Sequence, residues 1–239
     1  MRENNLRQDD LNLDGLKLYQ YTDGYHFTSD SVILANFVSV KHSDRCLEIG
    51  TGSGIIATLV NYKCKPKEII CFEIQQKYCD LAKKNFDYNN MQNITIICDK
   101  IQNHKNYITC PVDIVFCNPP YYKNNVCKKS EEKEIAICKH EEFLPLDELI
   151  QSVSQVLKFG GKFFFVYPAH RIDEVFETLS RHNLQVKRMF FVQPKQSKEP
   201  NTIVYECKKG GKKGVRILPT LITNNETGDY VQTIQKLYK

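Results

Sequence analysis

The four residues from Asn118 to Tyr121, Asn-Pro-Pro-Tyr, carry the groups needed to hold a planar amine. The nitrogen of such an amine is a weak nucleophile because its lone pair is delocalised. The side-chain oxygen of Asn118 and the carbonyl of Pro119 can each accept one N–H, which orients the NH₂ group and stabilises the charge that develops as it attacks. The prolines fix φ, and Tyr121 offers a π-face for stacking. The motif therefore predicts chemistry at a conjugated amine.

A glycine-rich segment, LEIGTGSG, follows one apolar run and precedes another. Its glycines, which permit a sharp turn and close approach of a ligand, are Gly50, Gly52 and Gly54. Dinucleotide-binding loops place a glycine where this chain has Ile55, and this loop lacks basic residues for a pyrophosphate. It carries instead an acid, Glu48, just before the first glycine. The segment predicts a ligand that has an amino-acid end and no phosphate.

Two further acids end the next two predicted strands. Glu73 can accept hydrogen bonds from both hydroxyls of a ribose, and Asp99 can accept from the exocyclic amine of an adenine. Open α/β sheets bind their ligands at the carboxyl ends of the strands. The acids beside a glycine-rich turn therefore predict a nucleoside-containing cofactor.

These residues depend on an alternation of strands and helices through residues 43–210. Strands are predicted at 45–50, 68–74, 94–99, 112–118, 162–167, 184–192 and 202–207, and helices at 55–62, 75–90, 145–157 and 172–182. The alternation predicts an α/β fold with a parallel sheet covered on both faces. The last two strands have no helix between them and predict an antiparallel edge hairpin, which makes a seven-stranded, mostly parallel sheet. We expect Gly160–Gly161 to break the chain before the fifth strand.

With these motifs the chain resembles the Rossmann-like class I methyltransferases that use S-adenosylmethionine. The resemblance implies that the glycine turn faces the methionine part of the cofactor, that Glu73 holds the ribose and that Asp99 holds the adenine. It also implies flanking contacts from Ile74 and Lys100, and a cofactor contact from Asn118. The resemblance covers about residues 45–210. We expect one domain over 1–239, with an N-terminal segment (1–42), a catalytic core (43–207) and a C-terminal extension (208–239).

The Asn-Pro-Pro-Tyr motif resembles that of methyltransferases that act on adenine N6 in DNA or RNA, guanine N2 in RNA, or glutamine in release factors. DNA enzymes usually carry a recognition domain, and glutamine enzymes a longer N-terminal helical domain. The segment Tyr25–Ala35, in which Thr28 or Ser29 is expected to cap a helix, resembles the signature of bacterial tRNA(Val) adenine-37 N6-methyltransferases. This implies methylation of an anticodon-loop adenosine. Guanine N2 in RNA, protein glutamine and a non-catalytic RNA-binding role stay open as alternatives.

The formal net charge of +5 is compatible with an RNA partner. Two polar regions are expected to contact it, the insert after Tyr121 and a run of lysines near the C-terminus, which we interpret as the tip of a hairpin that lies on phosphates. The candidate RNA-binding residues are Tyr121, Tyr122, Lys123, Lys208, Lys209, Lys212 and Lys213.

Composition excludes several other classes. The apolar runs are far shorter than the roughly 18 residues of a membrane span, and the N-terminus has no signal-peptide pattern. The ten cysteines are scattered singly without a C-x-x-C pair, so neither a disulfide scaffold nor a metal site is expected. We expect a cytoplasmic protein that binds neither membrane nor metal. The sequence gives no oligomeric state.

Overall fold

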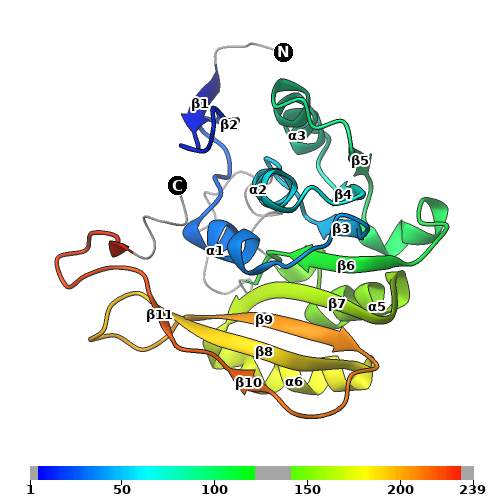
Figure 1. Cartoon of the computed structure of the whole chain (residues 1–239), viewed down its shortest axis with the longest axis vertical. Helices are drawn as coiled ribbons and strands as arrows, with labels where there is room; N and C mark the ends of the chain where they lie inside the picture. The colour runs from blue at the N-terminus through cyan, green and yellow to red at the C-terminus, as the bar shows by residue number, and fades with distance from the viewer. Residues whose placement is uncertain (1–4, 122–140, 233–239) are drawn as a thin grey trace.

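The structure of the protein is a computed structural model that describes residues 5–121 and 141–232 (Figure 1). The strands of its main sheet are β3 (Arg45–Ile49), β4 (Glu68–Glu73), β5 (Ile94–Cys98), β6 (Val112–Cys117), β7 (Leu157–Pro168), β8 (Leu184–Gln193), β9 (Thr202–Lys209), β10 (Arg216–Ile217) and β11 (Leu221–Ile222). Their order is β10-β8-β9-β7-β6-β3-β4-β5, and β11 also pairs with β8. The neighbours from β7 to β5 pair in parallel, whereas β9 is antiparallel to β7 and β8. The predicted α/β fold, with its parallel sheet and antiparallel edge pair, is confirmed.

Helices cover both faces of this sheet (Figure 1). They are α1 (Ser29–Phe37), α2 (Ile55–Cys64), α3 (Gln76–Tyr88), α5 (Leu146–Val156) and α6 (Ile172–Arg181), with short 3-10 turns η2 (Ile101–Asn106), η3 (Glu141–Phe143) and η4 (Ala169–Arg171). Side chains alternate along β7, so that Phe164 packs with α1 and α2 whereas Phe163 and Phe165 pack with α5 and α6. Because successive side chains of a strand face opposite sides, an unbroken apolar run fits a strand buried on both faces.

Among the residues that the structure describes, the main sheet has nine strands, so the predicted number of seven is wrong. The two additional strands, β10 and β11, come from the C-terminal extension and pair in parallel with β8. A separate hairpin of β1 (Leu6–Asp10) and β2 (Lys17–Tyr21) forms in the N-terminal segment. Asn85 of α3 holds β2 by accepting from the backbone N–H of Tyr19 at 2.7 Å and donating to its carbonyl at 3.0 Å. These strands are short or polar, and sequence periodicity therefore does not reveal them.

The glycine pair does not separate helix from strand as predicted. Strand β7 begins at Leu157, directly after α5, and Gly160–Gly161 lie within it. The register explains how they fit, because Val112 of β6 pairs with Leu157 whereas Ile114 pairs with Lys162. The additional residues of β7 bulge out of the ladder, and Gly160 supplies the positive φ of 80° for this bulge.

The lysine run is not a hairpin tip, so this part of the prediction is corrected. The β8–β9 hairpin turns at residues 194–201, and Lys208 and Lys209 are the last residues of β9. The chain then passes around the end of β8 and returns as β10. Lys208 pairs with Lys162 and Thr202 pairs with Pro168, which separates the lysine run from the carboxyl end of β7 by roughly 20 Å at about 3.3 Å per residue. Figure 1 shows the two turns at opposite ends of the sheet.

One lysine of this run serves the fold. The Lys209 ammonium donates to the carbonyls of Ser154 at 2.5 Å and Leu157 at 2.7 Å, at the C-terminal end of α5. Helix ends leave carbonyls without intrahelical partners, and a cation there also complements the helix dipole.

We expect Lys209→Met to lower the free energy of unfolding by about 1 to 2 kcal/mol, because it removes a charged donor from these carbonyls. The measurement is urea unfolding followed by circular dichroism. Lys212→Met removes the same charge from the neighbouring turn and is the matched control, with an expected change below about 0.5 kcal/mol. Equal losses in both variants would contradict the capping role.

Candidate active site

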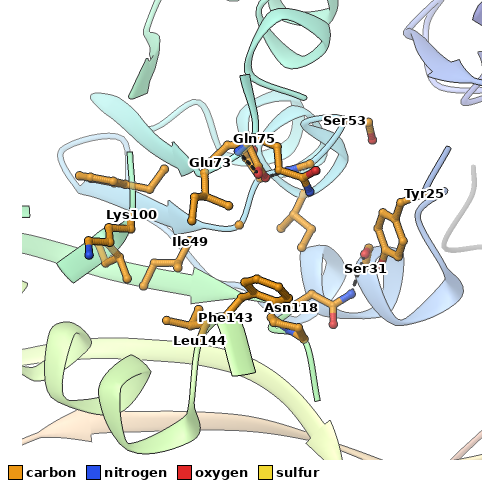
Figure 2. A pocket seen from close by; sticks show the side chains of 18 of the residues that line it. Tyr25, Ser31, Ile49, Ser53, Glu73, Gln75, Lys100, Asn118, Phe143 and Leu144 are labelled. Atoms are coloured by element: carbon orange, nitrogen blue, oxygen red, sulfur yellow. Dashed lines mark hydrogen bonds between the residues drawn. The ribbon is translucent and has the colours of Figure 1, made fainter. Parts of the chain in front are cut away.

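The carboxyl ends of β3 to β6 meet at an open cavity of about 870 Å³, which α1 borders on the far side (Figure 2). This volume includes the open solvent at the mouth of the cavity. Most of the predicted cofactor residues line it together: Gly50, Gly52, Glu73, Ile74, Asp99, Lys100 and Asn118. The parallel register is the reason, because it brings strand ends that are distant in sequence to one edge.

Glu73 fixes the glycine turn to the end of β4. Its two carboxylate oxygens accept from the backbone N–H groups of Gly52 at 3.0 Å and Gln75 at 2.9 Å (Figure 2). Burial raises the pKa of Glu73, and these hydrogen bonds act in the opposite direction. A carboxylate has about four acceptor positions, so two contacts leave capacity for the hydroxyls of a ligand.

Asp99 stands at the other end of the cavity, after β5. Its Oδ1 accepts from the Asn103 amide at 2.8 Å and from the Lys100 N–H at 2.7 Å, and its Oδ2 accepts from the Tyr107 hydroxyl at 3.0 Å. The bond from Asn103 is the main reason that the pKa of Asp99 lies below its ordinary value. The side chain is therefore a fixed, ionised acceptor.

The glycines divide into two roles. Gly50 and Gly52 have φ values of 71° and 54°, and a Cβ on either would meet no atom within 4 Å, which leaves their surface open to a ligand. Gly54 lies outside the cavity lining. A Cβ there would come within 2.7 Å of the Phe86 ring of α3, so this glycine allows α2 to pack against α3. The predicted ligand contact of Gly54 stays a prediction, since this glycine is not among the residues that line the cavity.

Glu48 also lies outside the cavity lining and is completely buried beneath the loop, which corrects its predicted contact with the ligand. Its Oε2 accepts from the Thr51 hydroxyl at 2.6 Å, and Cys71 Sγ lies 3.7 Å away. No partner reaches Oε1 in the part of the chain that the structure describes. Burial raises the pKa of Glu48 to about 8, so the carboxyl group is mostly protonated at neutral pH.

Asn118 follows β6 and faces the first turn of α1. Its Nδ2 donates to the hydroxyl of Ser31 at 2.9 Å (Figure 2). Thr28 occupies the N-cap of α1 as expected, but its side chain makes no capping hydrogen bond. Pro119 is buried, whereas Pro120 lines the cavity.

Tyr121 lies beside the cavity rather than in its lining. Its hydroxyl is 3.5 Å from Asp30 Oδ2, and its ring meets the edge of Tyr167 at a centroid distance of 6.3 Å. Burial raises the pKa of Asp30, although the Tyr121 hydroxyl acts to lower it. The aromatic residues that do line the cavity are Tyr25, Phe27, Phe72 and Phe143. Tyr25 and Phe27 come from the N-terminal segment, and the signal for them in the sequence was the resemblance of Tyr25–Ala35 to the signature of the tRNA(Val) adenine-37 N6-methyltransferases.

Arg171 is a further residue that sequence reasoning missed. Its buried guanidinium donates to Glu141 at 2.6 and 2.9 Å and to Glu174 at 2.5 and 2.8 Å, and it lies 3.5 Å from the Tyr121 carbonyl. It also covers the Tyr167 ring at 4.9 Å. Burial would raise the pKa of Glu141, but Arg171 holds it below the ordinary value. Arg171 thereby fixes the exit of the Asn-Pro-Pro-Tyr turn.

The predicted RNA-binding residues are not gathered at the cavity. Lys208, Lys212 and Lys213 lie at the opposite end of the sheet. Tyr122 and Lys123 lie outside the described residues.

Across residues 5–121 and 141–232, no three His, Cys, Asp or Glu side chains form a group that could hold a metal ion. The described cysteines are all free. No helix in these ranges is both long and apolar enough to cross a membrane.

Comparison with protein families matches residues 26–189 to the methyltransferase small domain. The chain belongs to this methyltransferase family. Two curated relatives are tRNA1(Val) (adenine(37)-N6)-methyltransferases. The one from Aliivibrio salmonicida is 22% identical over 226 residues, which cover 90% of this chain and 91% of the relative. The one from Bacteroides fragilis is 25% identical over 215 residues, which cover 88% of this chain and 89% of the relative.

Solved structures of other methyltransferases share the fold of this family member. A predicted O-methyltransferase from Agrobacterium tumefaciens gives a TM-score of 0.69 at 14% identity, covering 87% of this chain and 95% of its own. A ribosomal protein L11 methylase from Lactobacillus delbrueckii subsp. bulgaricus gives a TM-score of 0.55 at 15% identity, and the match covers 76% of this chain and 77% of the methylase. Since their named targets differ, the fold does not select the atom that is methylated.

The raised pKa of Glu48 leads us to expect that the stability of this methyltransferase depends on pH. The pKa of Glu48 is about 8 in the folded state against an ordinary value of 4.5, so its stabilising contribution is complete below about pH 4.5 and is lost as the pH rises to about 8. Glu48→Gln mimics the protonated acid. We expect the variant to match the wild type in melting temperature at pH 5 and to exceed it increasingly up to pH 8.

The measurement is thermal unfolding at half-unit steps from pH 5 to 9. Glu68→Gln, a partly exposed acid at the other end of the neighbouring strand, controls for removal of an acid in general. A constant difference between Glu48→Gln and wild type at all pH values would show that Glu48 is not protonated in the fold.

Proposed function

We propose that this protein transfers a methyl group from S-adenosylmethionine to the exocyclic N6 of an adenine in RNA, with adenosine 37 of a tRNA as the target. The observation that carries the proposal is the position of Asn118. It lies at the carboxyl end of β6 in the same cavity as Glu73 and Asp99, with one end of its amide held by Ser31.

The cavity fits the cofactor at each of its parts. The open surfaces over Gly50 and Gly52 suit the methionine part, since an added Cβ would occupy that space. Glu73 suits the ribose, Asp99 suits the adenine amine, and the exposed apolar side chain of Ile74 suits the face of the adenine ring. S-adenosylmethionine supplies an electrophilic methyl group when bound.

The residues of the Asn-Pro-Pro-Tyr turn act on the other reactant. The Asn118 Oδ1 and the Pro119 carbonyl accept the two N–H groups of the target amine, which aims the nitrogen lone pair and stabilises its growing positive charge. No strong base is needed before attack, because the methylated nitrogen becomes acidic and releases its proton readily. Tyr25 and Phe27 line the cavity and offer apolar faces for a flipped base.

The choice of RNA adenine is supported by relatives that match most of this chain. The curated relatives named as tRNA1(Val) (adenine(37)-N6)-methyltransferases cover 90% and 88% of it, which is more than the predicted catalytic core alone. An unpaired loop adenine also needs only a few kcal/mol to leave its stack.

The experiment that tests the target is incubation with labelled S-adenosylmethionine and total tRNA, followed by nucleoside mass spectrometry. We expect N6-methyladenosine, mapped to position 37. Label in N2-methylguanosine, or in glutamine of added release factors, would replace the proposed target by one of the two alternatives.

Asn118→Ala tests the transfer step. We expect the rate of methyl transfer to fall by about two orders of magnitude or more, because one of the two acceptors for the amine is lost. The dissociation constant of S-adenosylmethionine, measured by calorimetry, should change less than about threefold. Asn103→Ala is the matched control and should weaken cofactor binding, because Asn103 orients Asp99. Unchanged turnover of Asn118→Ala would overturn the mechanism.

We further propose that Lys212 and Lys213 contact RNA phosphates away from the target base, since they are exposed at the far end of the sheet. Reversing both charges should raise the KM for tRNA and leave kcat unchanged. The slope of log KM against the logarithm of the salt concentration should fall by about one for each phosphate contact that is lost. The control is reversal of Lys83 and Lys105, which are exposed elsewhere. An equal rise in KM for tRNA in both double variants would show that Lys212 and Lys213 do not contact the RNA.

A further inference from the structure

The segment of residues 24–27 borders the cavity and belongs to neither a helix nor a strand. Tyr25 and Phe27 line the cavity, whereas the His26 ring between them donates from Nε2 to the carbonyl of Tyr21 at 2.6 Å. Successive side chains of an extended chain point to opposite sides, which explains why alternate residues reach the cavity.

The Tyr25 ring lies at the end of the cavity where the target amine is proposed to bind. Figure 2 shows it near Asn118, with Lys100 at the opposite end. A planar base gains from such a ring only at close contact, because a gap of about 0.5 to 1 Å already loses about a quarter to a half of the dispersion energy. The position of the Tyr25 backbone therefore bears on how well a base is held.

Tyr78 of α3 holds this backbone in place. Its hydroxyl accepts from the backbone N–H of Tyr25 at 2.7 Å, and the two residues are 53 positions apart in the sequence. The direction of this hydrogen bond is certain, because a backbone N–H can only donate. Tyr78 is completely buried, and its ring meets the edge of the Tyr21 ring at a centroid distance of 5.9 Å. A buried N–H without an acceptor is costly, so this contact penalises movement of the segment.

The residues on both sides of Tyr25 are also closely fitted. A Cβ on Gly24 would come within 3.0 Å of the Tyr78 hydroxyl, so the backbone there lies directly against that side chain. The backbone N–H of Phe27 donates to Oε1 of Gln20 at 3.2 Å, and the amide of the buried Gln20 donates in turn to Asp9. The segment is therefore held between α3 and the N-terminal hairpin.

We propose that Tyr78 is a positioning residue, which fixes the backbone of Tyr25 and thereby the face that the Tyr25 ring offers to the target base. The inference rests on the proposed function, because it takes the base to bind at the Asn118 end of the cavity. It differs from a purely structural role, in which Tyr78 would hold the N-terminal segment on α3 whatever the side chain at position 25.

Removal of the Tyr25 ring separates these two roles. If Tyr78 acts through that ring, its hydroxyl should matter only while the ring is present. The experiment is a double-mutant cycle on kcat with wild type, Tyr78→Phe, Tyr25→Ala and the double variant. Tyr78→Phe removes the acceptor oxygen and keeps the buried ring.

We expect Tyr78→Phe to lower kcat about tenfold when Tyr25 is present and less than twofold in the Tyr25→Ala background. The dissociation constant of S-adenosylmethionine should change less than about twofold in Tyr78→Phe. An equal loss of kcat in both backgrounds, or no loss from Tyr78→Phe, overturns the proposal.

Tyr205→Phe is the matched control for this cycle. Tyr205 is also completely buried, and its hydroxyl has no hydrogen-bond partner in the part of the chain that the structure describes. The variant therefore removes the same atom without removing a contact, and kcat should stay unchanged.

A measurement without turnover keeps the test independent of the proposed function. The chain has no tryptophan, so Tyr25→Trp introduces a single indole whose fluorescence reports on this position. In that background Tyr78→Phe should raise the constant for quenching by acrylamide about twofold, because the segment is less firmly held, whereas Tyr205→Phe should not change it.

The two measurements distinguish the possible failures. If wild-type protein methylates no RNA adenine but the quenching responds to Tyr78→Phe, the proposed function fails while the hold of Tyr78 on position 25 stands. Quenching that does not respond overturns the positioning role itself.

Discussion

Parallel pairing of β3, β4, β5 and β6 is the constraint on which the site depends. In a parallel sheet every strand ends at the same edge, so residues 48–54, 73–75, 99–102 and 118–121 are neighbours in space. The hydrogen bond from the Gly52 N–H to Glu73 directly joins the segment that follows β3 to the end of β4. The helices on both faces keep water from the ladder and leave this edge as the accessible place for chemistry.

The polar groups beneath and beside the cavity hold its shape. Glu48 supports Thr51 from below the loop, Glu73 holds Gly52, and Ser31 holds Asn118. Each pair is buried or half-buried, where a fixed dipole acts more strongly than it would in water. Under the proposed function, the acceptors are therefore in place before a substrate arrives, which is how preorganised sites avoid reorganisation during the reaction.

Much of this arrangement was predictable because it follows from local patterns. Strand periodicity places Glu73, Asp99 and Asn118 at strand ends, and the topology then brings them together. Contacts between distant segments were not predictable in the same way. Nothing in the sequence near Ser31 indicates a partner 87 residues away, and Lys209 has the same local surroundings as lysines that lie in solvent. The role of Gly54 depends on the Phe86 ring, which only the packing of α2 on α3 brings near.

The Arg171 cluster has a consequence for how this enzyme can change over evolution. Arg171 contacts Tyr121 on one side of segment 122–140 and Glu141 on the other, so the base of that segment is fixed by one buried side chain. Loop-closure entropy grows only with the logarithm of length. Insertions and deletions between the two anchors therefore cost little folding free energy and leave Asn118 in place. The same Asn-Pro-Pro-Tyr turn can thus be kept by relatives whose chains differ in length between the two anchors.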